Sequence, residues 1–105
     1  MSKIKKLFIS QPMKGKTDEE ILQEREKAIA LAKERIEEQG EEADIEVIES
    51  FFQSAPAEAR PLWFLGKSLE LLSTADFVYF ASGWDAARGC KIERICAVEY
   101  GITIL

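Results

Sequence analysis

Short apolar runs alternate with stretches of helical periodicity along this sequence, and this alternation constrains the fold more than any other feature. The runs that predict strands cover residues 3–10, 45–48, 77–81 and 102–105. Helical patterns lie between them and begin at Thr17, at Pro61 and near Ala86. Strands that alternate with helices pair in parallel through right-handed crossovers, with helices on both faces of the sheet. We therefore predict an α/β, three-layer Rossmann or flavodoxin-like fold, with a four-stranded parallel sheet in the order 2-1-3-4.

The first two predicted helices have clear start signals. Thr17 and Glu20 form a capping box, and Gly40 is the expected stop of the first helix. We interpret its charged face, Arg25 included, as a solvated surface. The apolar residues expected in the core of the first helix are Ile21, Leu22, Ala28, Ile29, Ala32 and Ile36, and those of the second are Leu62, Leu65, Leu69 and Leu72.

Length and charge bound the possible functions. The 105 residues suffice for one domain, residues 1–105, and 47% of them are hydrophobic, which is ordinary for a protein with a core. The net charge of −5 opposes binding to nucleic acids or anionic membranes, which attract basic surfaces. The sequence has neither a secretion signal nor an apolar run of the roughly 18 residues that a membrane span needs. We expect a cytoplasmic protein.

The residue types present also limit the chemistry. The sequence contains no histidine, so catalysis must use carboxylates, hydroxyls, thiols or amines, and a zinc site has almost no ligands. The two cysteines, Cys90 and Cys96, point on the order of 120° apart on one predicted helix, which predicts free thiols. We expect no metal and no cofactor.

Two loops are expected at the carboxyl edge of the sheet, residues 10–16 and 81–89. Ligands of open parallel sheets bind beyond the carboxyl ends of the strands where the strand order reverses, here between the first and third strands. Both loops are rich in glycine, proline and polar residues. The sequence therefore predicts a small-molecule site between them.

Glu93 is the main candidate for a functional side chain. It follows the second of these loops and is expected at the flank of an apolar helical stripe that includes Ile95. Two interpretations remain open from the residues alone. Glu93 acts on a ligand from a partly desolvated position, or it complements the positive helix end or pairs with Arg88 or Lys91.

Three other side chains also have two interpretations. Trp84 can stack on a nucleobase or pack beside the sheet. Asp76 is expected to cap the entry to a strand or to bind loop amides, rather than to bind a ligand. Cys90 begins a helix, where the pKa of a thiol can fall, but it has no histidine partner for nucleophilic chemistry.

Three motifs resemble the nucleoside 2-deoxyribosyltransferase-like superfamily in their order and spacing, and most closely its short branch found in bacteria and phages. The resemblance covers nearly the whole chain. The motifs are Ile9-Ser10-Gln11-Pro12-Met13-Lys14-Gly15, Ala75-Asp76 before an apolar strand, and Gly89-Cys90-Lys91-Ile92-Glu93 followed by Ala97 and Gly101.

The resemblance implies cleavage of the N-glycosidic bond of a nucleoside or nucleotide. Glu93 would be the nucleophile at the anomeric carbon, as in retaining glycosidases, with Asp85 assisting. The implied substrate-binding residues are Ser10, Gln11, Pro12 and Met13 at the base or sugar, Lys14 and Arg88 at a phosphate, and Gly83, Trp84 and Gly89 in the second loop.

The sequence departs from the transferases in ways that keep alternatives open. Gln11 stands where they commonly have glycine, and Lys91-Ile92 replaces a small pair before Glu93. The alternatives are hydrolysis, nucleotide binding or sequestration without turnover, and an interaction protein with a vestigial site. A surplus of aromatic residues predicts a homodimer or larger homo-oligomer, and it comprises Phe51, Phe52, Trp63 and Phe64.

Overall fold

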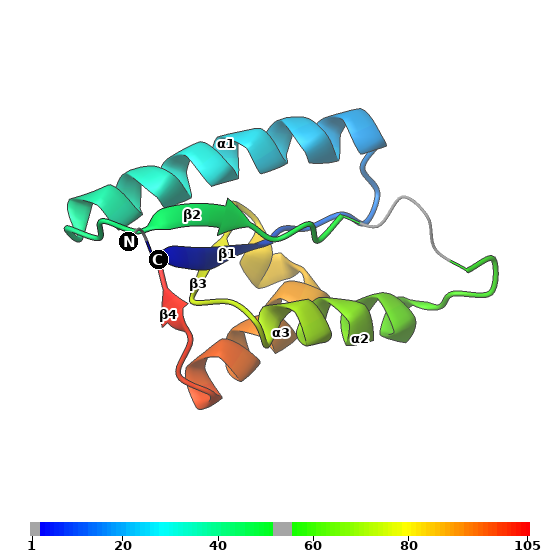
Figure 1. Ribbon diagram of the computed structural model, residues 1–105. Helices are drawn as coiled ribbons and strands as arrows, with labels where there is room; N and C mark the ends of the chain where they lie inside the picture. The colour runs from blue at the N-terminus through cyan, green and yellow to red at the C-terminus, as the bar shows by residue number, and fades with distance from the viewer. Residues whose placement is uncertain (1–2, 52–55) are drawn as a thin grey trace.

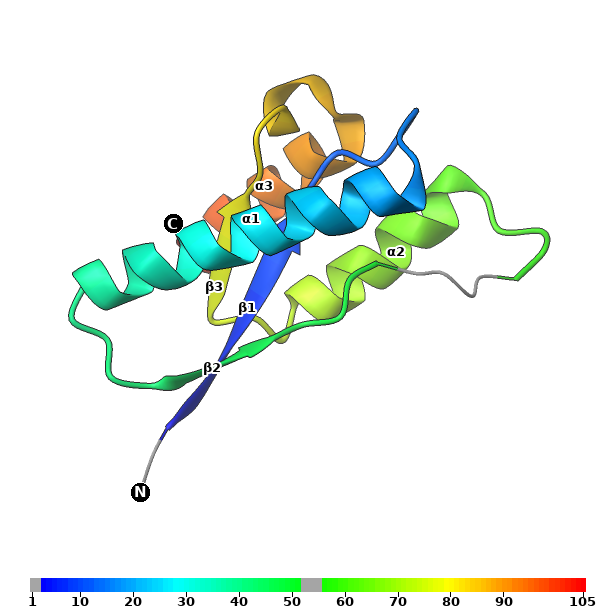
Figure 2. The same ribbon diagram turned by 90° about the horizontal axis from the view of Figure 1, so that it is seen from above.

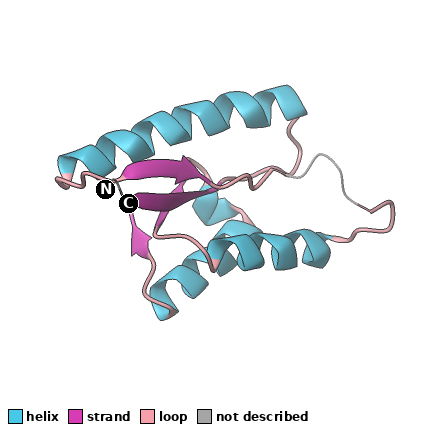
Figure 3. Ribbon diagram, viewed as in Figure 1, coloured by secondary structure: helices cyan, strands magenta, loops and turns pink. Residues whose placement is uncertain are grey.

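The computed structural model describes residues 3–51 and 56–105 and has a four-stranded, all-parallel sheet between two helical layers (Figure 1). The strands are β1 (Ile4–Ser10), β2 (Asp44–Val47), β3 (Phe77–Phe80) and β4 (Thr103–Ile104), in the order β2-β1-β3-β4. The helices are α1 (Asp18–Glu38), α2 (Pro61–Leu72) and α3 (Arg88–Glu99), with a 3₁₀ turn, η1 (Trp84–Ala86), before α3. Figure 3 shows that α1 covers one face of the sheet and that α2 and α3 lie on the other. The predicted three-layer α/β fold and its strand order are confirmed.

β1 lies at the centre of the sheet, and its two neighbours cover different parts of it (Figure 2). β2 pairs with β1 only as far as Leu7, whereas β3 pairs with it from Leu7 to Ser10. The carboxyl end of β1 is therefore flanked by β3 but no longer paired with β2.

The core has two parts, separated by the sheet. Alternate residues of β1 point to opposite faces. Leu7 and Ile9 pack with the small and apolar residues of α1, and Phe8 packs with residues of α2 and α3 such as Leu72 and Ala97. The alternation continues at the strand end, where Ser10 contacts α3 and Gln11 contacts α1.

The start and stop signals of α1 are confirmed. The Thr17 side chain accepts a hydrogen bond from the Glu20 amide, and the Glu20 carboxylate accepts one from the Thr17 amide. Gly40 has a φ of +77° just after the helix. Two expectations for this helix are wrong, because Leu22 is exposed and Arg25 is buried.

For α2 and α3, the sequence prediction of which side of the helix is buried needs correction. Leu62 is 75% exposed, because α2 packs on the sheet through its second half, including Leu69 and Leu72. Ile95 is 62% exposed, because α3 directs Cys90, Glu93 and Ala97 toward the sheet and therefore residue 95 away from it. No helix in the described ranges is both long enough and apolar enough to cross a membrane.

Candidate functional site

Ser10 and Glu93 meet at the carboxyl edge of the sheet, between β1 and β3. The Ser10 hydroxyl donates a hydrogen bond of 2.7 Å to Glu93 Oε1. Ser10 ends β1, and Glu93 lies in the second turn of α3. The strand order reverses at this place, where ligands of doubly wound sheets bind.

The Glu93 carboxyl group is buried, with 6% of the residue exposed. Burial raises its pKa from 4.5 to about 7, and the hydrogen bond from Ser10 opposes this rise. No ion pair within residues 3–51 and 56–105 involves Glu93, so pairing with Arg88 or Lys91 is not observed there. Near neutral pH this carboxyl group therefore exists in both protonation states.

Cys90 lies one helical turn before Glu93 and is also buried. Burial raises the pKa of its thiol, the Ser10 hydroxyl lowers it, and the nearby Glu93 charge raises it further. The net shift is upward, opposite to what a helix N-terminus favours, because desolvation dominates. Cys90 and Cys96 are free thiols, as predicted, and Cys90 is neutral at pH 7.

The two predicted binding loops touch each other. The Ala81 amide donates to the Ser10 carbonyl at 2.8 Å, which extends the β1–β3 pairing by one bond. Gly83 has a φ of +87°, and a Cβ atom built on it would lie 3.5 Å from Pro12 Cγ. The loops therefore meet where a glycine permits the turn beside Pro12.

Gln11 anchors the first loop to α1. Its Nε2 atom donates to the Ile21 carbonyl at 3.0 Å, while its buried Oε1 atom has no hydrogen-bond partner in the described part of the chain. Met13 is half-buried and Lys14 is exposed at the tip of the loop. Lys16 is tied to α1 through an ion pair with Glu24.

Other predicted residues are not gathered around Glu93. Asp85 is exposed in η1 and has no hydrogen bond or ion pair within the described ranges. The Trp84 ring packs on Phe80, with ring centroids 5.5 Å apart, and the Arg94 guanidinium lies 4.8 Å from its centroid. The Trp84 contacts therefore agree with its packing interpretation. Arg88 is exposed and Gly89 is half-buried at the start of α3.

Asp76 takes the structural role expected of it. One oxygen of its carboxylate accepts a hydrogen bond of 2.8 Å from the Lys6 amide, at the entry to β3. This contact ties β3 to β1 at the end of the sheet opposite to Glu93.

Arg25, expected on a solvated face, is instead buried near the carboxyl edge of the sheet. Arg25 donates from Nη1 to Ser50 Oγ at 3.0 Å and from Nη2 to the Ile48 carbonyl at 2.6 Å. Ser50 Oγ donates in turn to the Ile9 carbonyl at 3.3 Å. Glu49, the nearest carboxylate, lies 3.7 Å away and its side chain is 85% exposed.

Beyond the end of β2, the Arg25 and Ser50 side chains bind backbone carbonyls in place of strand pairing. The Ile48 amide still bonds the Leu7 carbonyl, but the next carbonyl on that side, Ile9, is bonded by a serine side chain instead. The sequence does carry a signal for the burial of Arg25, since this residue occupies a position in the apolar series of Ile21 and Ala28.

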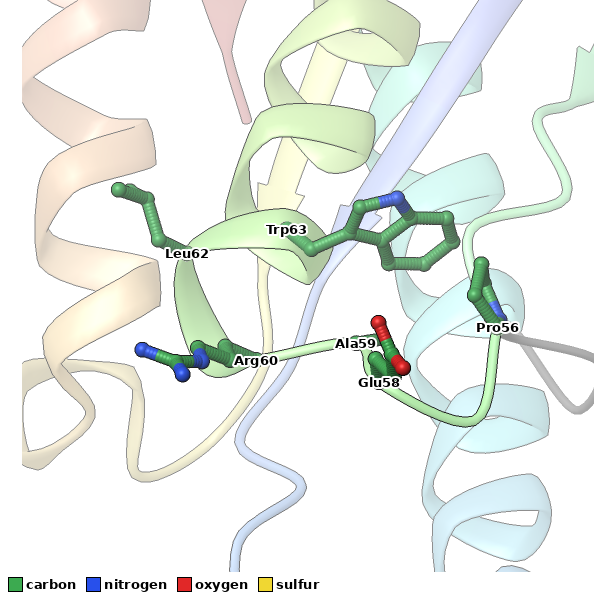
Figure 4. Close-up of a pocket in the computed structure, with 6 residues that line it drawn as sticks. All are labelled: Pro56, Glu58, Ala59, Arg60, Leu62 and Trp63. Atoms are coloured by element: carbon green, nitrogen blue, oxygen red, sulfur yellow. The ribbon is translucent and has the colours of Figure 1, made fainter.

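Two shallow hollows lie away from Glu93. One, of about 450 Å³, is at the start of α2, where Trp63 lies beside Pro56 and above Glu58, with Leu62 on the other side of the helix (Figure 4). The second, of about 380 Å³, is on the outer face of α3. In the described part of the chain no three acidic or cysteine residues form a possible metal site.

Comparisons with protein-family models, curated proteins and solved structures each found no match to this chain. The fold defines the protein as a doubly wound α/β domain, and the residues around Glu93 are the basis for a proposal about its chemistry.

Proposed function

We propose that this protein cleaves the N-glycosidic bond of a nucleoside or nucleotide, with Glu93 as the nucleophile. The observation that carries this proposal is the buried Glu93 carboxyl group, held by Ser10 at the β1–β3 edge. A structural carboxylate with this burial would ordinarily have a cation beside it, because an unpaired buried charge is costly. A carboxyl group that remains unpaired at the ligand edge of such a fold is a candidate for chemistry. The resemblance of the sequence motifs to deoxyribosyltransferases supports the same assignment.

The proposed reaction has two steps. An oxygen of the Glu93 carboxylate attacks the anomeric carbon, the bond to the base nitrogen breaks, and the base leaves with that electron pair and takes a proton from the solvent. Water then attacks the anomeric carbon of the glycosyl ester and gives up one proton to the solvent, which returns the free carboxylate and releases the sugar with a new hydroxyl group. Ser10 bonds Oε1, so Oε2 is the oxygen available for attack.

Substrate access sets a requirement on the first loop. Because Glu93 is only 6% exposed, a ligand reaches it only if a neighbouring segment moves, and the loop after β1 is the segment proposed to move. The tip of this loop, Lys14 and Gly15, is exposed, and its main internal contact is one backbone hydrogen bond of 3.2 Å from Lys16 to Met13. Lys14 and Arg88, both exposed, are the proposed contacts for a phosphate group.

A second candidate function is nucleotide binding without turnover. Asp85, the proposed assistant of Glu93, is exposed and has no contact with it among the hydrogen bonds and ion pairs of the described residues. Without a second group placed to protonate the leaving base, cleavage loses the general acid catalysis that is typically worth about 10²–10⁴-fold, which favours binding of an intact nucleotide.

One experiment separates the two functions. Purified protein is incubated with deoxynucleosides, ribonucleosides and their 5′-monophosphates, and free base is measured by chromatography. The glycosidase predicts base release from at least one substrate and a loss of at least about 10³-fold in Glu93→Gln, with Glu34→Gln, at an exposed glutamate of α1, as the matched control. Thermal stabilisation by a nucleotide without base release would support the binding function, and neither effect would refute both.

A further inference from the structure

The outward face of α3 carries two large apolar side chains without cover. Ile95 is 62% exposed and Val98 is 59% exposed, and they lie one helical turn apart. The exposed leucines of α1, Leu22 and Leu31, are nine residues apart and therefore point to opposite sides of their helix. Single exposed apolar residues are ordinary, whereas a contiguous pair on one helix face is typical of a contact surface.

A hollow runs along the same face of α3. Its volume is about 380 Å³, and it is lined by Trp84, Lys91, Arg94, Ile95, Val98 and Glu99. Arg94 stacks over the Trp84 ring at 4.8 Å, which fixes one wall of the hollow. An apolar floor between fixed walls suits side chains from another helix.

The charged residues on this face have opposite signs at equal distances on either side of Ile95. Lys91, Ile95 and Glu99 are four residues apart and form one ridge of α3. If two such ridges face each other antiparallel about a two-fold axis at Ile95, each Ile95 meets its own copy. Each Lys91 then lies at the same level as the partner's Glu99. Ridges with this spacing align in the most common class of helix pairs, with a crossing angle on the order of −50°.

We propose that this face of α3 is a homodimer interface with Ile95 on the two-fold axis and a Lys91–Glu99 ion pair on each side of it. The interface is isologous, because the same patch serves on both copies. It does not depend on the function proposed for Glu93, which points to the opposite side of α3. It also differs from the aromatic surface expected from the sequence. Of that surface, Phe52 lies outside the described residues.

Light scattering coupled to gel filtration tests this proposal over a range of protein concentrations. We expect the wild type at twice the 11.9 kDa of one chain, and Ile95→Asp at the mass of a monomer. Lys91→Glu should weaken the dimer about tenfold or more, because it sets like charges against each other. The double variant Lys91→Glu with Glu99→Lys should return to within about threefold of the wild type, since it reverses both partners.

Leu31→Asp on α1 is the matched control, and it should leave the dimer intact. Circular dichroism verifies that every variant is folded. A monomeric wild type at all concentrations, a dimeric Ile95→Asp, or a double charge reversal that stays as weak as Lys91→Glu would each overturn the proposal.

Discussion

Among the described residues, Glu93 and Arg25 are the buried acidic and basic side chains near the carboxyl edge of the sheet, and they are held differently. Arg25 donates to two acceptors and has a carboxylate 3.7 Å away. Glu93 accepts from one hydroxyl and has no cation beside it in the described ranges. The first arrangement is that of a structural anchor, and the second leaves the protonation state of the carboxyl group sensitive to pH.

The pH dependence of stability provides a test of the Glu93 environment. Because folding raises the pKa of Glu93 from 4.5 to about 7, the folded state binds an extra proton between these pH values. The stability of the wild type should therefore fall as the pH rises from about 4.5 to 7, by on the order of 3 kcal/mol from this group. Glu93→Gln removes the titration and keeps an acceptor for Ser10.

Urea unfolding of both proteins from about pH 4 to pH 8.5 measures this effect. The two should have similar stability at pH 4, and Glu93→Gln should be the more stable at pH 8. A stability difference that does not change with pH would show that the pKa of Glu93 is not raised.

Ser50 tests the anchor around Arg25. Ser50→Ala removes the acceptor of Arg25 Nη1 and the donor to the Ile9 carbonyl, both in a buried region. We expect a loss of about 1–3 kcal/mol in the free energy of unfolding. Ser73→Ala, at an exposed serine whose hydroxyl donates to the Glu70 carbonyl, is the control and should change it by no more than about 0.5 kcal/mol. Equal losses in both variants would contradict the role of the anchor.

Among the helices and strands, sequence signals predicted the ends of an element correctly where neighbouring residues bind its free backbone groups. The capping box of Thr17 and Glu20 and the stop at Gly40 are properties of neighbouring residues, so they could be read from the sequence. The phase of α3 could not be read in this way. Ile95 and Glu93 compete for the buried side, and the hydrogen bond from Ser10, 83 residues away, favours Glu93.

The same limit applies to the site. The edge between β1 and β3 followed from the order of elements, and the structure brings Ser10 to Glu93 there. The contacts of Arg25 depend on where β2 leaves the sheet, which no local pattern encodes.

Replacement by alanine should change the free energy of unfolding in opposite directions at two glycines, one in a loop and one in a helix. Gly83, in the loop after β3, has a φ of +87° and lies beside Pro12, so Gly83→Ala should destabilise the protein by about 1–2 kcal/mol. Gly66, inside α2, has free space around it, so Gly66→Ala should stabilise it by about 0.5–1 kcal/mol. Thermal or urea unfolding measures both changes, and the same sign for the two would contradict the described backbone.

In the whole molecule, the two faces of α3 have different proposed roles. The inner face places Glu93 against Ser10 at the end of β1, and the outer face is proposed to meet a second copy. Because these roles lie on opposite sides of one helix, Ile95→Asp should separate the subunits and leave the Ser10–Glu93 contact in place.

The rate of base release by the wild type and by Glu93→Gln between about pH 5 and 9 tests directly whether Glu93 is the nucleophile. A nucleophile must be ionised, so the wild-type rate should rise through pH 7 and level off above it, while Glu93→Gln stays near zero. Base release by Glu93→Gln at the wild-type rate, or a wild type that releases no base at any pH, would contradict the assignment of Glu93.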